Sequence, residues 1–153
     1  MADAEAMDVD LEKDAAMRAA VEQKAEEVSR LVAAKSMEEA LREAVADPPV
    51  DTKDAEIKAM AARTVLEVIS ASKDSEVDTL LSKLDDEGED VLMKYLYALL
   101  EGAEECAKLL KWHEKLVKKS GLGCIVRALT DRKTVMRAAT GQAGSAAYAA
   151  HTR

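Results

Sequence analysis

Residues 57–70 read IKAMAARTVLEVIS, and this stretch decides the fold of the chain. Apolar side chains fall on nearly every side of a helix built from it, which is the pattern of a helix surrounded by other helices. Residues 91–100, VLMKYLYALL, show the same pattern. We therefore expect two central helices, with the rest of the chain packed around them.

The segments on either side carry apolar residues on one helical face only. A long first helix is predicted by apolar residues that recur three or four positions apart, namely Met17, Val21, Ala25, Val28 and Val32. Ser36 and Glu39 have capping-box spacing at the start of a second helix, which the prolines at 48 and 49 stop. Similar stripes predict helices within residues 75–84, 106–117 and 122–129, and the acidic run 85–90 is expected to be a solvated turn.

These patterns predict an all-α chain with a single compact domain of about seven helices over residues 15–135. Short links favour antiparallel neighbours, so we expect an antiparallel stack or a short α-superhelix. Residues 1–14 hold six acidic residues against one lysine and predict a flexible acidic arm ahead of the first helix. Residues 136–153 are rich in Ala, Gly, Ser and Thr and predict a low-complexity tail.

The charge of the chain argues against nucleic acid and membrane as partners. The formal net charge is -8, which repels phosphates and anionic lipids. Only the C-terminal region is basic, with five Arg and Lys against one Asp over residues 121–153.

No apolar run approaches the ~20 residues that span a bilayer, and two isolated cysteines suit a reducing cytosol. We expect a cytoplasmic protein.

No pattern in the sequence predicts catalysis, a metal or a cofactor. His113 precedes Glu114, as in a zinc-protease helix, but position 117 is Val where that motif needs a second His. Cys106 and Cys124 lie on apolar stripes, where burial would raise a thiol pKa rather than activate it. We interpret His113 as a helix-face residue that makes one hydrogen bond, and both cysteines as core residues.

Two further motifs are better explained by structure than by ligand binding. The turn at 121–123, Gly-Leu-Gly, lacks the third glycine and the lysine of a phosphate loop, and the acidic run 85–90 lacks the alternating ligands of a calcium loop. A basic cluster near the C-terminus has no interleaved aromatics, which suits an acidic protein surface better than a nucleic acid. It consists of Arg127, Arg132, Lys133 and Arg137.

Four segments together resemble one known family. They are LMKYLY at 92–97, WHEK at 112–115, GLGCIVRALTDRKTV at 121–135, and Pro48-Pro49 with Thr52-Lys53. In this order and at these distances they resemble subunit five, the small helical subunit, of the actin-related protein 2/3 complex. The resemblance covers roughly residues 21–135, and members of the family usually end near the Arg-Lys-Thr-Val segment.

The resemblance implies a non-catalytic structural subunit of the assembly that nucleates branched actin filaments. It implies contacts with subunit 4 and with the β-propeller subunit 1, an N-terminal arm that reaches actin-related protein 2, and a place in the cytoplasmic actin cytoskeleton, including cortical actin and cell projections. ATP would belong to the actin-related subunits, so no cofactor is expected here. The candidate partner-binding residues are Arg127, Arg132, Lys133, Thr134 and Val135 near the C-terminus and Asp8 and Asp10 in the arm. The alternative is a free-standing helical adaptor that binds a peptide or a small GTPase.

Overall fold

A computed structural model describes residues 2–102 and 104–135 of the chain. Within these ranges the structure has seven α-helices and no strand. The helices are α1 (Ala2–Ala33), α2 (Met37–Val45), α3 (Ala55–Ala71), α4 (Val77–Ser82), α5 (Asp86–Glu101), α6 (Cys106–Ser120) and α7 (Gly123–Thr130). The predicted all-α class is confirmed.

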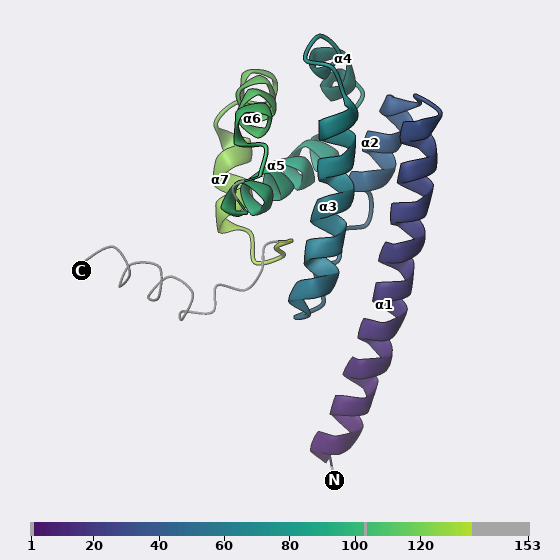
Figure 1. Cartoon of the computed structure of the whole chain (residues 1–153). Coiled ribbons are helices and arrows are strands. Elements are labelled where there is room, and N and C mark those ends of the chain that lie inside the picture. The colour runs from purple at the N-terminus through teal and green to yellow at the C-terminus, as the bar shows by residue number, and fades with distance from the viewer. Residues whose placement is uncertain (1, 103, 136–153) are drawn as a thin grey trace, which may run out of the picture.

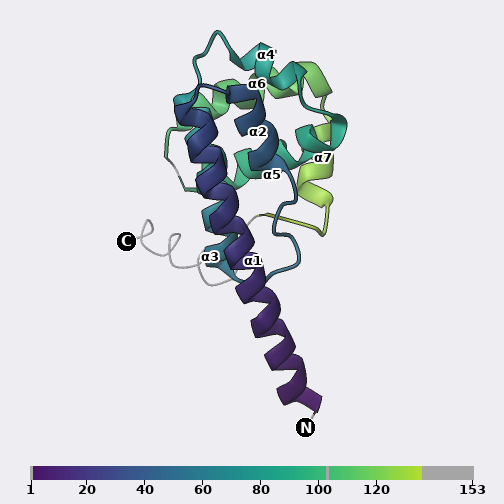
Figure 2. The ribbon, with the colours of Figure 1, turned by 90° about the vertical axis from the view of Figure 1, so that its right-hand side faces the viewer.

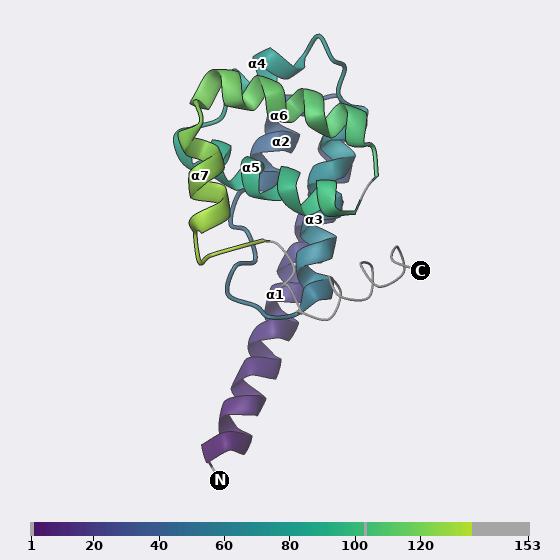
Figure 3. The same cartoon turned by 90° about the vertical axis from the view of Figure 1, so that its left-hand side faces the viewer.

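The helices form two layers (Figure 1). In the first, α1 and α3 run in the same direction, and α2 runs back between their ends and packs against both. In the second, α5 and α6 lie antiparallel across the first layer, and α7 packs against both (Figure 3). The short helix α4 covers one end of the second layer by packing on α6.

The core lies between the layers and is built mainly by α3 and α5. Both central helices are confirmed, because Ile57, Val65 and Ile69 of α3 and Leu92 and Leu96 of α5 are completely buried. Burying a side chain of this size stabilises the fold by about 1.5–3 kcal/mol. Four other helices, α1, α2, α6 and α7, pack on α3 or α5.

Two lysines of α6 cap the C-terminal ends of α3 and α4. The Nζ of Lys108 donates to the carbonyls of Ser70 and Ser72 at 2.7 Å each, at the end of α3. The Nζ of Lys119 donates to the carbonyls of Leu81 at 2.6 Å and Leu84 at 3.3 Å, at the end of α4. The last carbonyls of a helix lack amide partners in the next turn, and the lysines donate to them there. The Leu81 carbonyl also accepts the Leu84 amide at 3.1 Å.

Three local predictions are corrected. The first helix begins at Ala2, so residues 2–14 continue α1 and are not a segment ahead of it. Ser36 precedes α2 as expected, but its side chain makes no capping hydrogen bond.

The acidic run 85–90 starts a helix rather than forming a solvated turn. The carboxylate of Asp85 accepts the Gly88 amide at 2.8 Å and caps α5, because carboxylates bind the unpaired amides of a helix start. Glu89, in the same run, is buried. The predicted tail, residues 136–153, lies outside the described residues.

Candidate docking surfaces

Helix α7 turns an apolar face away from the rest of the protein. Its buried face consists of Cys124 and Ala128, and burial raises the pKa of the Cys124 thiol. The exposed fractions of Leu122, Val126 and Leu129 are 72%, 60% and 59%. Leu122 directly precedes α7 and already has helical backbone angles. The three residues are spaced i, i+4 and i+7, so they share one side of the helix. We call Leu122, Val126 and Leu129 the α7 stripe.

Helix α5 fixes the position of α7 through an ion pair. The Nε and Nη2 of Arg127 donate to the two carboxylate oxygens of Asp90 at 2.8 and 2.9 Å. A bidentate pair of this kind restricts the orientation of both side chains. The pKa of the Arg127 guanidinium is raised, first by its hydrogen bond to Asp90. Arg127 is therefore engaged within the chain and orients α7.

A second polar contact of α5 holds the segment that follows α7. The Nζ of Lys94, whose side chain is only 9% exposed, donates to Asp131 Oδ2 at 2.6 Å and to the Lys133 carbonyl at 2.9 Å. The ammonium, followed by the Lys133 amide, holds the pKa of the Asp131 carboxyl below its ordinary value. We call this arrangement the Lys94 anchor.

A third contact ties the end of α6 to α5. The carboxylate of Glu89 accepts hydrogen bonds from the ammonium of Lys119 and the hydroxyl of Ser120. Glu89 is buried, so its charge needs these partners. Consecutive turns of α5 thus hold α6, α7 and the last described segment.

The predicted C-terminal residues differ in accessibility. Arg132 and Lys133 are exposed, and neither side chain forms an ion pair with another described residue. Thr134 is half-buried, whereas Val135 is buried in the core and anchors the segment. The apolar residues of α7 can be recognised in the sequence, but which of them are buried and which are exposed cannot. The spacing of Leu122, Val126 and Leu129 was visible, yet nothing local shows which apolar face of a short helix is buried.

The predicted N-terminal residues lie on a separate surface. Asp8 and Asp10 are exposed on the first turns of α1, which project beyond the body of the molecule (Figure 2). Exposed apolar side chains lie beside them, with exposed fractions of 67% for Met7 and 65% for Leu11. The structure does not bring Asp8 and Asp10 together with the C-terminal group.

The residues considered for chemistry have structural surroundings. The Nε2 of His113 lies 3.0 Å from the Tyr97 hydroxyl, and the two rings meet edge to face at 5.4 Å between centroids. This is the single hydrogen bond expected of His113. Among the described residues, no group of three or more His, Cys, Asp or Glu could hold a metal ion. No helix in the described part of the chain is long and apolar enough to cross a membrane.

The fold and its surfaces define a class: an all-α protein with exposed apolar side chains on α7 and at the start of α1. Comparison with known proteins gives the family. Residues 2–135 match the family model described as ARP2/3 complex 16 kDa subunit (p16-Arc). The chain is 38% identical over 122 residues to actin-related protein 2/3 complex subunit 5 of Dictyostelium discoideum, covering 80% of this chain and 88% of that protein.

Vertebrate relatives match over a shorter stretch. The human actin-related protein 2/3 complex subunit 5-like protein is 42% identical over 111 residues, which cover 71% of this chain and 72% of that protein. Subunit 5-C of Xenopus laevis is 39% identical over 111 residues, covering 71% and 74%.

The chain belongs to the 16 kDa subunit family of the ARP2/3 complex. Members of this family are structural subunits of the complex that nucleates actin filaments and are not enzymes. The resemblance seen in the sequence is confirmed, as is the expectation of a non-catalytic protein. The partners of the chain are therefore other subunits of this complex, and its setting is the actin cytoskeleton. Family membership also decides against the free-standing adaptor.

Proposed function

We propose that the chain is held in the ARP2/3 complex by the α7 stripe together with Arg132 and Lys133. The observation that carries this proposal is the exposure of three large apolar side chains on one side of α7. Contiguous exposed apolar residues are typical of protein interfaces, and a basic edge favours an acidic partner surface. Subunit 4 and the β-propeller subunit 1 are the partners that the resemblance implies for this surface.

We propose a separate role for the projecting end of α1. Met7 and Leu11 lie one helical turn apart, with Asp8 and Asp10 beside them. An exposed helix end with apolar and acidic side chains suits a smaller, regulated contact rather than the main attachment. Actin-related protein 2 is the partner implied for it. Through the assembly, the chain would act on actin filaments at the cell cortex and in cell projections.

Co-purification tests the attachment. The double variant Val126→Asp with Leu129→Asp should fold normally, because both side chains are exposed, but should be absent from the complex isolated through another subunit. Burying two charges in an apolar interface costs several kcal/mol. Leu110→Asp on α6 is the matched control, since Leu110 is 55% exposed and lies outside the α7 stripe. Normal recovery of the double variant would place the attachment elsewhere.

A second experiment separates the two surfaces. Met7→Asp with Leu11→Asp should leave the chain in the complex and change the rate of filament nucleation, measured by fluorescence of labelled actin. Loss of the chain from the complex would show that the α1 end belongs to the main attachment. Reversing Arg132 and Lys133 to Glu should weaken attachment more at low salt than at high salt, because ion pairs at exposed surfaces are screened over about 10 Å at 0.1 M.

A further inference from the structure

A groove runs between the two layers and shares only Lys133 with the proposed docking surfaces. One wall is α1, with Met17 and Val21; the floor is the connector that contains Pro48 and Pro49; the other wall is the start of α5, with Val91, and the segment 131–133. Its volume is about 1040 Å³. We call it the α1–α5 groove.

Hydrogen bonds fix the floor of the groove against α1 at both ends. At one end, the Nζ of Lys24 donates to the carbonyls of Ala46 and, at 3.2 Å, Asp47. At the other end, the hydroxyl of Thr52 donates to Asp14 Oδ1 at 2.6 Å. The opposite wall is held by the Lys94 anchor described above. The groove is therefore formed before any partner binds, which reduces the entropy lost on binding.

The rim of the groove is acidic while its walls are apolar. Asp47, Asp51, Asp86 and Glu87 line it, and none of these carboxylates forms an ion pair with a described residue. Lys24 and Lys94 also line the groove, but their ammonium groups bind carbonyl and carboxylate oxygens of this chain. Lys13 and Lys133 line it too, and neither forms an ion pair with a described residue, so four unpaired carboxylates face two unpaired ammonium groups and the free charge of the groove is negative.

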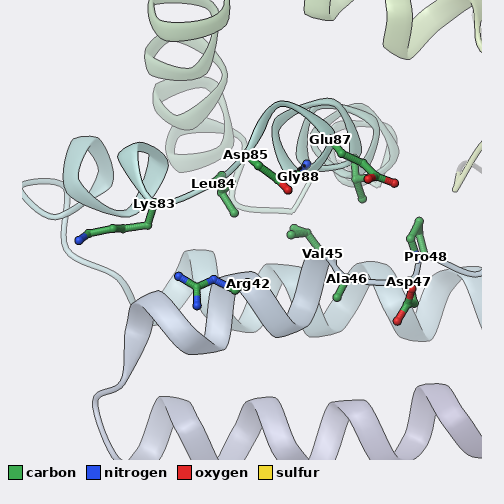
Figure 4. Close-up of a pocket in the computed structure, with 11 residues that line it drawn as sticks. Arg42, Val45, Ala46, Asp47, Pro48, Lys83, Leu84, Asp85, Glu87 and Gly88 are labelled. Carbon is green, nitrogen blue, oxygen red and sulfur yellow. Dashed lines mark hydrogen bonds between the residues drawn. The ribbon is translucent and has the colours of Figure 1, made fainter.

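The acidic rim of the groove ends at two basic residues (Figure 4). A smaller pocket of about 320 Å³ adjoins the groove and shares Asp47, Pro48, Glu87 and Val91 with it. In Figure 4, Asp47 and Glu87 lie toward one side of this pocket, and Arg42 and Lys83 lie toward the other. A positively charged ligand would be attracted along the rim and repelled at Arg42 and Lys83.

We propose that the α1–α5 groove binds a basic amphipathic helix of a protein partner. Its apolar face would pack on Ala16, Met17 and Ala20 of α1 and on Val50 of the connector. Its Lys or Arg side chains would pair with the four free carboxylates. The groove follows α1 from Lys13 to Lys24, which at 1.5 Å per residue is about 16 Å, or three turns of bound helix. Charge complementarity is the argument, since an exposed apolar groove with an acidic rim selects against acidic segments. The α7 stripe has a basic edge, so the two surfaces select partners of opposite charge.

Binding of a defined probe to the full-length chain tests this proposal. The probe is a fluorescent, amidated 14-residue peptide with Leu and Ala on one helical face and Lys on the other; the control peptide has Glu in place of Lys. Fluorescence anisotropy at 0.1 M salt should show binding of the Lys peptide and none of the Glu peptide. Equal binding of the two, or no binding of the Lys peptide, would overturn the proposal.

Two matched pairs of variants localise the binding. Ala20→Trp should fill the groove and weaken binding at least tenfold, whereas Ala19→Trp, on an exposed neighbour outside the lining, should change it less than twofold. Asp51→Lys with Glu87→Lys should weaken binding at least tenfold. Glu22→Lys with Glu26→Lys changes the net charge equally on the exposed side of α1 and should have a much smaller effect. Equal losses within either pair would mean non-specific attraction and would overturn the proposal.

Two other occupants would give different results. If the chain's own basic C-terminal residues filled the groove, Arg137→Ala with Arg153→Ala would strengthen probe binding. If a second copy filled it, the wild-type chain would form a dimer in analytical ultracentrifugation that Ala20→Trp abolishes and Ala19→Trp does not. Either result would overturn the assignment to a partner helix; an unchanged affinity and a monomer support it.

Discussion

Replacing Lys94 with methionine should destabilise the protein by about 2 kcal/mol. Methionine keeps most of the apolar stem but removes the ammonium, which donates to Asp131 at 2.6 Å and to the Lys133 carbonyl at 2.9 Å. A hydrogen bond to a charged group contributes about 1.5–3 kcal/mol in favourable cases. We take about 1 kcal/mol for each here, because Asp131 is 43% exposed and water can replace the lost partner.

The assay is thermal unfolding followed by circular dichroism, with Lys111→Met as control. In a domain of this length, 1 kcal/mol corresponds to about 2–4 °C in Tm, so Lys94→Met should lower Tm by about 4–8 °C. Lys111 also pairs at 2.6 Å, with Asp74, but the two side chains are 58% and 56% exposed. Its loss should cost less than about 0.5 kcal/mol, as is usual for exposed pairs.

Equal Tm shifts for the two variants would refute the reasoning, because they would show that burial does not determine the strength of these pairs. A double-mutant cycle with Asp131→Asn isolates the pair itself and should give a coupling energy near 1 kcal/mol. Hydrogen exchange should also become faster in residues 131–135 of Lys94→Met. Unchanged exchange there would show that the Lys94 anchor does not hold the segment.

Three further predictions concern the pH response, a turn and the first helix. The pKa of Asp131 is lower in the folded protein than its ordinary value. Its contribution to stability is therefore present above about pH 4 and is lost as the pH falls through the folded pKa. Hydrogen exchange of residues 131–135 should become faster in acid, and Asp131→Asn should remove that part of the response. Gly121→Ala should lower the free energy of unfolding by about 1–2 kcal/mol, because Gly121 has φ +76, a backbone angle that alanine disfavours. No atom lies within 4 Å of an added Cβ, so the cost would come from the backbone and not from a clash. Gly102→Ala, at φ -75, should cost far less in the same urea titration. Ala6→Pro should reduce the helical signal at 222 nm without lowering Tm, since residues 3–13 are exposed; an unchanged signal would contradict a helix that begins at Ala2.

The amino-acid sequence by itself determined the helical class, the number of helices and the two central ones. The reason is that helical periodicity is local: apolar residues three and four apart need no knowledge of their neighbours. Val65 and Leu96 could be recognised as core residues because their helices are apolar on nearly all sides. The same local information excluded the simple motifs for catalysis and metal binding.

Local sequence patterns gave wrong predictions where the role of a residue depends on contacts outside its own segment. The acidic run 85–90 resembles a solvated turn when it is considered alone, and its role at the start of α5 depends on Asp85 capping the helix. Glu89 is buried only because Lys119 and Ser120 approach it from the end of α6, 30 and 31 residues away in the chain. No local pattern encodes such a contact.

The tertiary structure alone decided which apolar faces remain exposed. Helix α7 has two apolar faces, and packing on α5 and α6 buries the smaller one, Cys124 and Ala128, while Val126 and Leu129 stay exposed. The ion pair between Asp90 and Arg127 joins α7 to α5 over a separation of 37 residues. The α1–α5 groove depends on the packing in the same way, because its walls come from α1, the connector and α5. Which surfaces stay exposed depends on how the helices pack together, whereas each helix forms because of the residues within it.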